Sequence, residues 1–204
     1  EVTISKLGYV KRTSLAEYRE QNRGGKGSKG GATRNEDFIE HLFVGSTHDY
    51  LLIFTERGRC FWLKTYKLPE GSKTSKGRAM QNIINLPSGD KVMAYLTVEN
   101  LEDADFLNSH YIVFCTKKGV IKKTMLEAFS RPRQNGIIAI SIKDDDDLLE
   151  VKLTNGNCDI MLGSKSGRAI RFPESKVRSM GRTAAGVRGI NLRNADDEVI
   201  GMVC

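Results

Sequence analysis

The chain has 204 residues, a formal net charge of +7 and 39% hydrophobic residues. This length allows one large domain or two small ones, and no run of about 18 apolar residues is present that could cross a membrane. Residues 1–6 lack the pattern of a signal peptide and resemble a chain cut within a strand. The excess of lysine and arginine points first to nucleic acid or another anionic surface as partner.

Four units of roughly 50 residues follow one another along the chain, each marked by the same residues in the same order. An apolar run ends in Ser/Thr-x-x-Gly, and the glycines are Gly8, Gly58, Gly119 and Gly167. An apolar residue stands ten positions later, at Tyr18, Leu68, Phe129 and Val177. A second glycine follows at Gly27, Gly77, Gly136 and Gly186. An aspartate opens each closing strand, at Asp37, Asp90, Asp147 and Asp197.

Each unit contains about four strand-like runs bounded by Gly, Pro and Asp. In the second unit these runs are 50–55, 60–63, 79–86 and 91–98. No window keeps a 3.6-residue period over a dozen residues, and segments 14–18 and 126–129 could make one helical turn at most. The pattern predicts one all-β, propeller-like domain over 1–204, with at least four four-stranded blades at about 1–49, 50–108, 109–157 and 158–204. An open arc of four blades would expose a strand edge, which predicts that the chain is a fragment.

Basic residues gather in two places in each unit, while acids gather at the closing strands and the links between units. The first hairpins carry Lys6, Lys11, Arg12, Arg57, Arg59, Lys64, Lys117, Lys118, Lys122, Lys123, Lys165, Arg168 and Arg171. The long loops that follow carry Arg23, Lys26, Lys29, Lys73, Lys76, Arg78, Arg131, Arg133, Arg178, Arg182 and Arg188. Stacked units would align these residues into one basic band free of acids. Such a band favours sequence-independent binding to the DNA backbone, and its curvature would bend the duplex.

Other site chemistry finds little support in the sequence. Glu20 stands where a Walker A motif needs glycine, so the segment 20–28 is not a phosphate-binding P-loop. The consecutive acids 144–147 lack the alternating spacing of a calcium loop, which predicts a solvated turn. The four cysteines lack metal-site spacing, which predicts buried thiols in a reducing cytoplasm; they are Cys60, Cys115, Cys158 and Cys204. We therefore expect no catalytic site, metal or cofactor in this chain.

One glycine-rich basic heptapeptide stands out within this frame. It is Gln21-Asn22-Arg23-Gly24-Gly25-Lys26-Gly27, called the box below. The box resembles the signature Gln-Arg-Arg-Gly-Gly-Lys-Gly found in the C-terminal domain of the bacterial DNA gyrase A protein. Asn22 stands where the signature has arginine, and we expect the flanking Lys29 and Arg34 to supply the missing charge. Further matches to the family are the segments 8–12, 36–39, 47–49, 122–124 and 186–190.

The resemblance covers essentially the whole chain and implies a β-pinwheel, whose blades exchange strands with their neighbours. It implies that the box and the basic rim bind and wrap double-stranded DNA. In the family this wrap lets a cytoplasmic, nucleoid-associated heterotetramer, made of two gyrase A and two gyrase B proteins, introduce negative supercoils with ATP and Mg²⁺. The family usually has six blades, and four are counted here. Two alternatives stay open: the corresponding domain of topoisomerase IV, and a propeller that binds an acidic protein partner.

Overall fold

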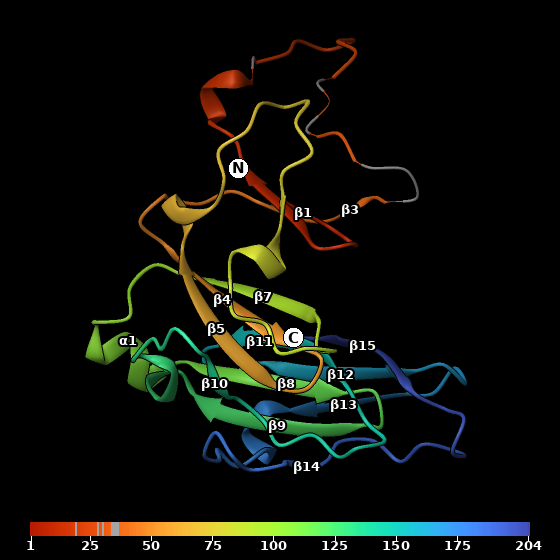
Figure 1. Ribbon diagram of the computed structural model, residues 1–204. Helices are drawn as coiled ribbons and strands as arrows, with labels where there is room; N and C mark the ends of the chain where they lie inside the picture. The colour runs from red at the N-terminus through yellow and green to blue at the C-terminus, as the bar shows by residue number, and fades with distance from the viewer. Residues whose placement is uncertain (19, 28, 30, 34–36) are drawn as a thin grey trace.

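The computed structural model describes residues 1–18, 20–27, 29, 31–33 and 37–204, and it contains four small antiparallel sheets (Figure 1). The first sheet has the order β3-β1-β2-β6 and the second the order β10-β5-β4-β7. Their strands are β1 (Val2–Ser5), β2 (Tyr9–Arg12), β3 (Ile39–Phe43), β4 (Tyr50–Thr55), β5 (Arg59–Lys64), β6 (Arg78–Ala79), β7 (Val92–Val98) and β10 (Ile137–Ile138). The prediction of an all-β, propeller-like arrangement is confirmed.

The third sheet has the order β11-β8-β9-β14, and the fourth contains β13-β12-β15. Their strands are β8 (Tyr111–Thr116), β9 (Val120–Met125), β11 (Leu148–Thr154), β12 (Asp159–Ser164), β13 (Ala169–Pro173), β14 (Val187–Arg188) and β15 (Val199–Val203). Short 3₁₀ turns lie at Leu15–Glu17, Thr65–Lys67, Met80–Asn82, Leu126–Phe129 and Glu174–Lys176, and α1 spans Ala104–Ser109. No helix in the described part of the chain is long and apolar enough to span a membrane.

The fourth strand of each of the first three sheets comes from the following unit. Ala79 of β6 pairs with Tyr9 of β2, and Ile137 of β10 pairs with Cys60 of β5. Val187 of β14 pairs with Ile121 of β9 in the same register. Among the described residues, β13 has no such partner. Neighbouring blades are thus linked by backbone pairing, as the resemblance implied.

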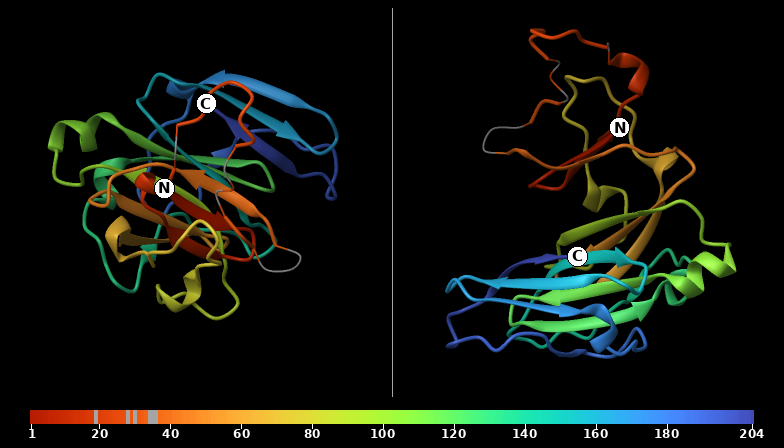
Figure 2. Two further views of the ribbon diagram at one scale, coloured as in Figure 1. Left: turned by 90° about the horizontal axis from the view of Figure 1, so that it is seen from above. Right: turned by 180° about the vertical axis from the view of Figure 1, so that it is seen from behind.

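The described residues form three apolar cores, each between two successive sheets. Leu51 and Val10 belong to the core between the first and second sheets, and Phe54 and Phe114 to the core between the second and third. The third core joins the third and fourth sheets around Val113. Strand β11 contacts both β7 and β15, so the closing strands lie on the inner side of the blades and the exchanged strands on the outer edge (Figure 2).

The repeated glycines and aspartates build the hairpin turns. The first glycine of each unit has a positive φ, from 86° at Gly167 to 90° at Gly58 and Gly119, a conformation that favours glycine. Asp90 Oδ1 accepts the backbone N–H of Arg57, and Asp197 Oδ1 accepts that of Ser166. These carboxylates satisfy turn N–H groups that have no strand partner.

Several details of the sequence interpretation need correction. In the third unit Asp146, not Asp147, accepts the turn N–H, from Lys118 at 2.9 Å, and its side chain is buried although the sequence predicts a solvated turn at 144–147. In place of the predicted strand 79–86 the structure has the two-residue strand β6, Arg78–Ala79, because the chain enters a 3₁₀ turn at Met80–Asn82 directly after pairing. Helix α1 was not predicted; its signal is Asp103, whose Oδ1 accepts the N–H of Asp105. Of the four cysteines, only Cys60 and Cys115 are buried.

Candidate nucleic-acid interface

The long loops run along the outer edges of the preceding sheets. In the loop 69–77, Gly71 N–H donates to the Arg12 carbonyl, while Met80 N–H, just after β6, reaches the Gly8 carbonyl. The loop 178–186 follows β9 in the same way, since Met180 N–H donates to the Lys123 carbonyl. The loop 130–136 lies along β5, since Arg59 Nη2 donates to the Asn135 carbonyl. We call the outer rim formed by these three loops and their exchanged strands the long-loop edge.

The long-loop edge presents cations to solvent with few acids nearby. Segments 130–138 and 178–188 contain no aspartate or glutamate, and Glu70 is the sole acid of segment 69–79. Glu70 lies 3.7 Å from Arg12, and Glu127, just before the second segment, pairs with Arg131 at 2.9 Å. Cations of these segments with exposed side chains are Lys76, Arg78, Arg131, Arg133, Arg178 and Arg188. Exposed cations therefore gather along this edge, which is one part of the predicted basic band.

The box forms an exposed loop beside the N-terminal sheet. Gln21 Oε1 accepts the N–H of Gly27 at 2.8 Å, and the Asn22 carbonyl accepts the N–H of Gly25 at 3.1 Å. Gly24 and Gly27 have positive φ values of 84° and 71°. All seven residues of the box are exposed, and Lys29 is exposed as well. The loop thus offers two cations on a backbone that only glycine adopts easily; Arg34 lies outside the described residues.

Three of the lysines predicted for the rim are buried between units, which corrects their assignment. Lys11 Nζ donates to the carbonyls of Ser72 and Lys73 at 2.8 and 3.0 Å. Lys122 is fully buried, and its Nζ donates to the carbonyls of Ala139 and Arg182 at 2.6 and 2.5 Å. Burial is the main cause that lowers the pKa of Lys122 to about 7, and the nearby Arg182 adds to it. These side chains hold one unit to the next and cannot reach a phosphate.

Lys123 is the third buried lysine and has a carboxylate partner. Its Nζ lies 3.5 Å from Glu174 Oε2, and the side chain of Glu174 is fully buried. Thr154 Oγ1 donates to the same carboxylate oxygen at 2.9 Å, so the charge of Glu174 has a second partner. Lys123 belongs to the third unit and Glu174 to the fourth, so the pair joins the two units. Breaking it would leave an uncompensated buried charge.

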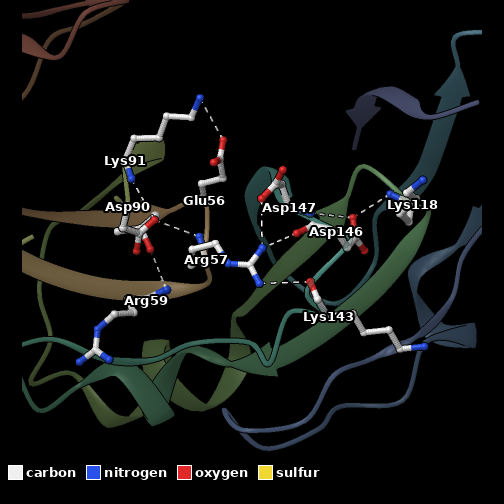
Figure 3. A network of polar contacts seen from close by, with 10 residues as sticks. Glu56, Arg57, Arg59, Asp90, Lys91, Lys118, Lys143, Asp146 and Asp147 are labelled. Carbon is white, nitrogen blue, oxygen red and sulfur yellow. Dashed lines mark hydrogen bonds and ion pairs between the residues drawn. The ribbon is translucent and has the colours of Figure 1, made fainter. Parts of the chain in front are cut away.

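The hairpin turns that end in Gly8, Gly58, Gly119 and Gly167 form a second region, which we call the turn face. Cations and acids are interleaved there. Arg57 Nη1 donates to the Asp146 carbonyl at 2.5 Å and pairs with Asp147 Oδ1 at 3.1 Å, and Nη2 donates to the Lys143 carbonyl (Figure 3). Lys118 Nζ donates to the Ala195 carbonyl at 3.0 Å. The expectation that acids lie away from all the basic segments is therefore wrong at this face.

The remaining rim residues divide between contact and exposure. Arg59 donates to the Asn135 carbonyl, Arg168 to the Asn191 carbonyl, and Arg171 pairs with Asp159 at 2.6 Å. Lys165 is exposed, whereas Lys73, Lys117 and Arg182 are half-buried. Among the described residues, no group of three or more His, Cys, Asp or Glu could hold a metal ion. Lys67 is a further exposed cation next to the long-loop edge, and the sequence does not predict it as a rim residue. Its position in the repeat gives no signal; only its proximity to Arg133 in the folded chain does.

Comparisons with known proteins agree on one family. The chain matches the family described as DNA gyrase C-terminal domain, beta-propeller, over residues 2–46, 49–99, 110–155 and 159–204. It is 46% identical over 196 residues to the DNA gyrase A protein of Haemophilus influenzae and 46% identical over 201 residues to that of Staphylococcus aureus. These matches cover 96% and 98% of the chain, but the chain spans only 22% of either relative.

Solved structures give the same fold. The C-terminal domain of DNA topoisomerase IV matches with a TM-score of 0.80 at 31% identity, covering 98% of this chain and 59% of that one. The DNA gyrase A C-terminal domain matches with a TM-score of 0.72 at 25% identity, covering 98% of this chain and 63% of that one.

Proposed function

The chain belongs to the DNA gyrase C-terminal domain family, and we propose that it binds duplex DNA along the long-loop edge without reading the base sequence. The observation that carries this proposal is the row of exposed cations on consecutive outer edges. The side chains of Lys76, Arg78, Arg133 and Arg178 make no ion pair within the described part of the chain. Such cations neutralise phosphates and release counterions, which supplies affinity that does not depend on sequence.

Curvature of the edge supports wrapping as the mode of binding. The three long loops follow successive sheets around the molecule, so a duplex that contacts all of them must bend with the blades (Figure 2). No described element is a helix long enough to fill a major groove, because α1 has six residues. Binding would therefore depend on phosphate contacts and on the ease of bending the duplex.

Salt and length dependence together test this proposal. We expect log K for a duplex to fall by about 0.9 for every phosphate contact with each tenfold rise in salt. A duplex that reaches all three loops should bind more tightly and with a steeper salt slope than one that reaches a single loop. Fluorescence anisotropy with labelled duplexes of graded length measures both quantities. Affinity independent of salt, or equal for short and long duplexes, would contradict the proposal.

Within the whole enzyme, we propose that this binding directs supercoiling. The natural gyrase A protein would assemble with gyrase B in the cytoplasm, and ATP and Mg²⁺ would act in other domains. Replacing Arg23 and Lys26 with alanine removes the two exposed cations of the box. We expect this change to leave the melting temperature of the chain unchanged and to abolish negative supercoiling by the assembled enzyme. A large loss of thermal stability would show that the box is structural.

The matching domain of topoisomerase IV is a second candidate, favoured by the TM-score of 0.80 to that structure. The identity of 46% to two gyrase A proteins and the nearly complete box favour gyrase. An assay of the assembled enzyme separates the two: negative supercoiling of relaxed DNA supports gyrase, and relaxation with decatenation alone supports topoisomerase IV.

A further inference from the structure

The junction between the second and third units differs chemically from the two beside it. At the first and third junctions the second strand carries two neighbouring cations, Lys11-Arg12 and Lys122-Lys123, which bond to the next unit. At the second junction the same positions hold Phe61 and Trp62. Trp62 Nε1 donates to the Phe129 carbonyl at 2.9 Å, just as Arg12 Nε donates to the Leu68 carbonyl at 2.9 Å. The indole thus makes the structural bond while replacing a charge with an aromatic surface.

A groove of about 710 Å³ lies beside this indole, between the 3₁₀ turn Thr65–Lys67 and the loop 132–134. Its lining includes the aromatic side chains of Tyr50, Trp62 and Tyr66 and the cations Lys64, Lys67 and Arg133. None of its lining residues is an aspartate or a glutamate. The volume is in the range of sites that hold small ligands, and the chemistry combines flat apolar rings with positive charge.

Some of the aromatic and basic side chains that line the groove are available to a ligand. Lys64 Nζ lies 3.9 Å from the centre of the Tyr50 ring and donates to the His48 carbonyl, so this pair is closed on itself. Tyr66 is 49% exposed, and Trp62 is half-buried. The side chains of Lys67 and Arg133 make no hydrogen bond or ion pair with any described residue. An exposed ring and two available cations therefore face one groove.

We propose that this groove binds an unpaired nucleotide of single-stranded DNA, with its base stacked on Tyr66 and its phosphate held by Lys67 and Arg133. Base–aromatic stacking tolerates any base, and cations beside the ring track the backbone. A duplex could use only the cations, because its bases are stacked on one another. The inference goes beyond duplex binding and is carried by the groove alone.

Trp62 is the only tryptophan of the chain, so its emission reports directly on the groove. We would titrate the chain with an oligothymidylate of about ten nucleotides, a common site size, and with an abasic strand of equal length and charge. The oligothymidylate should quench Trp62 and bind roughly tenfold or more tightly than the abasic strand, the fold-change that one stacked base supplies. Equal affinity for the two strands, or unchanged Trp62 emission, would overturn the proposal.

Variants of Tyr66 separate stacking from charge. Tyr66→Leu should lose about tenfold in oligothymidylate affinity and none in abasic-strand affinity, and Tyr66→Phe should keep both. Circular dichroism confirms that each variant is folded. Equal quenching by polyglutamate would overturn the proposal in favour of an acidic peptide. Tyr66→Leu should leave duplex affinity unchanged. If the unaltered chain binds the oligothymidylate but no duplex, the proposed function is refuted and this inference stands.

Discussion

The long-loop edge and the turn face are both rich in lysine and arginine, yet they present those charges differently. On the turn face, Asp146 accepts the turn N–H of Lys118, and the adjacent Asp147 lies 3.1 Å from Arg57, so carboxylates stand next to the cations. At the long-loop edge, backbone pairing and buried lysines join the units, and the carboxylate that pairs with one of these lysines, Glu174, is itself buried and absent from the surface. The comparison shows that the way a loop is closed decides whether its charge is available to a ligand.

The largest expected effect concerns the buried lysines that bond one unit to the next beneath the long-loop edge. Lys122→Ala leaves a cavity and two carbonyls without their donor, and we expect the free energy of unfolding to fall by about 3–5 kcal/mol. Lys118→Ala on the turn face is the matched control and should change it by less than about 0.5 kcal/mol. Urea denaturation measures both. Equal effects would show that burial does not distinguish these two lysines.

Gly58→Val tests the hairpin turn between β4 and β5. Gly58 has a φ of 90°, and a Cβ there would collide with the Ile140 carbonyl of the exchanged segment. We expect a loss of about 3 kcal/mol in the free energy of unfolding. Gly89→Val has a comparable φ of 80° but open space around it, so it should lose only about 1 kcal/mol. A wild-type unfolding curve for Gly58→Val would refute the need for glycine there.

The pH dependence of stability tests whether Lys122 is buried as described. Its pKa is about 7 in the folded chain against 10.5 for a free lysine side chain. Between these values the unfolded chain binds a proton that the folded chain does not, so stability rises with pH by up to about 1.4 kcal/mol per unit. Lys122→Met lacks this titration. From about pH 7 to pH 9 the free energy of unfolding of the unaltered chain should therefore rise relative to that of Lys122→Met. A difference that stays constant with pH would contradict the burial of Lys122.

Sequence reasoning succeeded where local chemistry decides the structure and failed where a neighbouring unit does. The positive φ of Gly8, Gly58 and Gly27 follows from a repeated residue type, and so does the turn role of Asp90. The burial of Lys122 does not, because its acceptors are backbone carbonyls of residues 17 and 60 positions away. A cation in a strand looks the same in sequence whether it faces water or the carbonyls of the next blade.

The smallest expected effect concerns the ion pair of the turn face. Asp147→Asn removes the charge partner of Arg57, whose side chain is 35% exposed. We expect less than about 1 kcal/mol of destabilisation in urea, since partly exposed pairs contribute little. Duplex affinity at low salt should rise slightly, because one negative charge is lost. A destabilisation of several kcal/mol would mean that the pair, and not the backbone contacts of Arg57, holds the two units together at this face.

The most direct test compares duplex binding after equal charge removal from the two regions. One variant carries Lys76→Ala, Arg78→Ala and Arg178→Ala on the long-loop edge, and the other carries Lys117→Ala, Lys118→Ala and Lys165→Ala on the turn face. We predict that the first loses affinity for a long duplex and reduces the salt slope by about 0.9 for each contact removed, while the second keeps a slope close to that of the unaltered chain. Equal losses from the two variants, or a larger loss from the turn face, would contradict a DNA path along the long-loop edge.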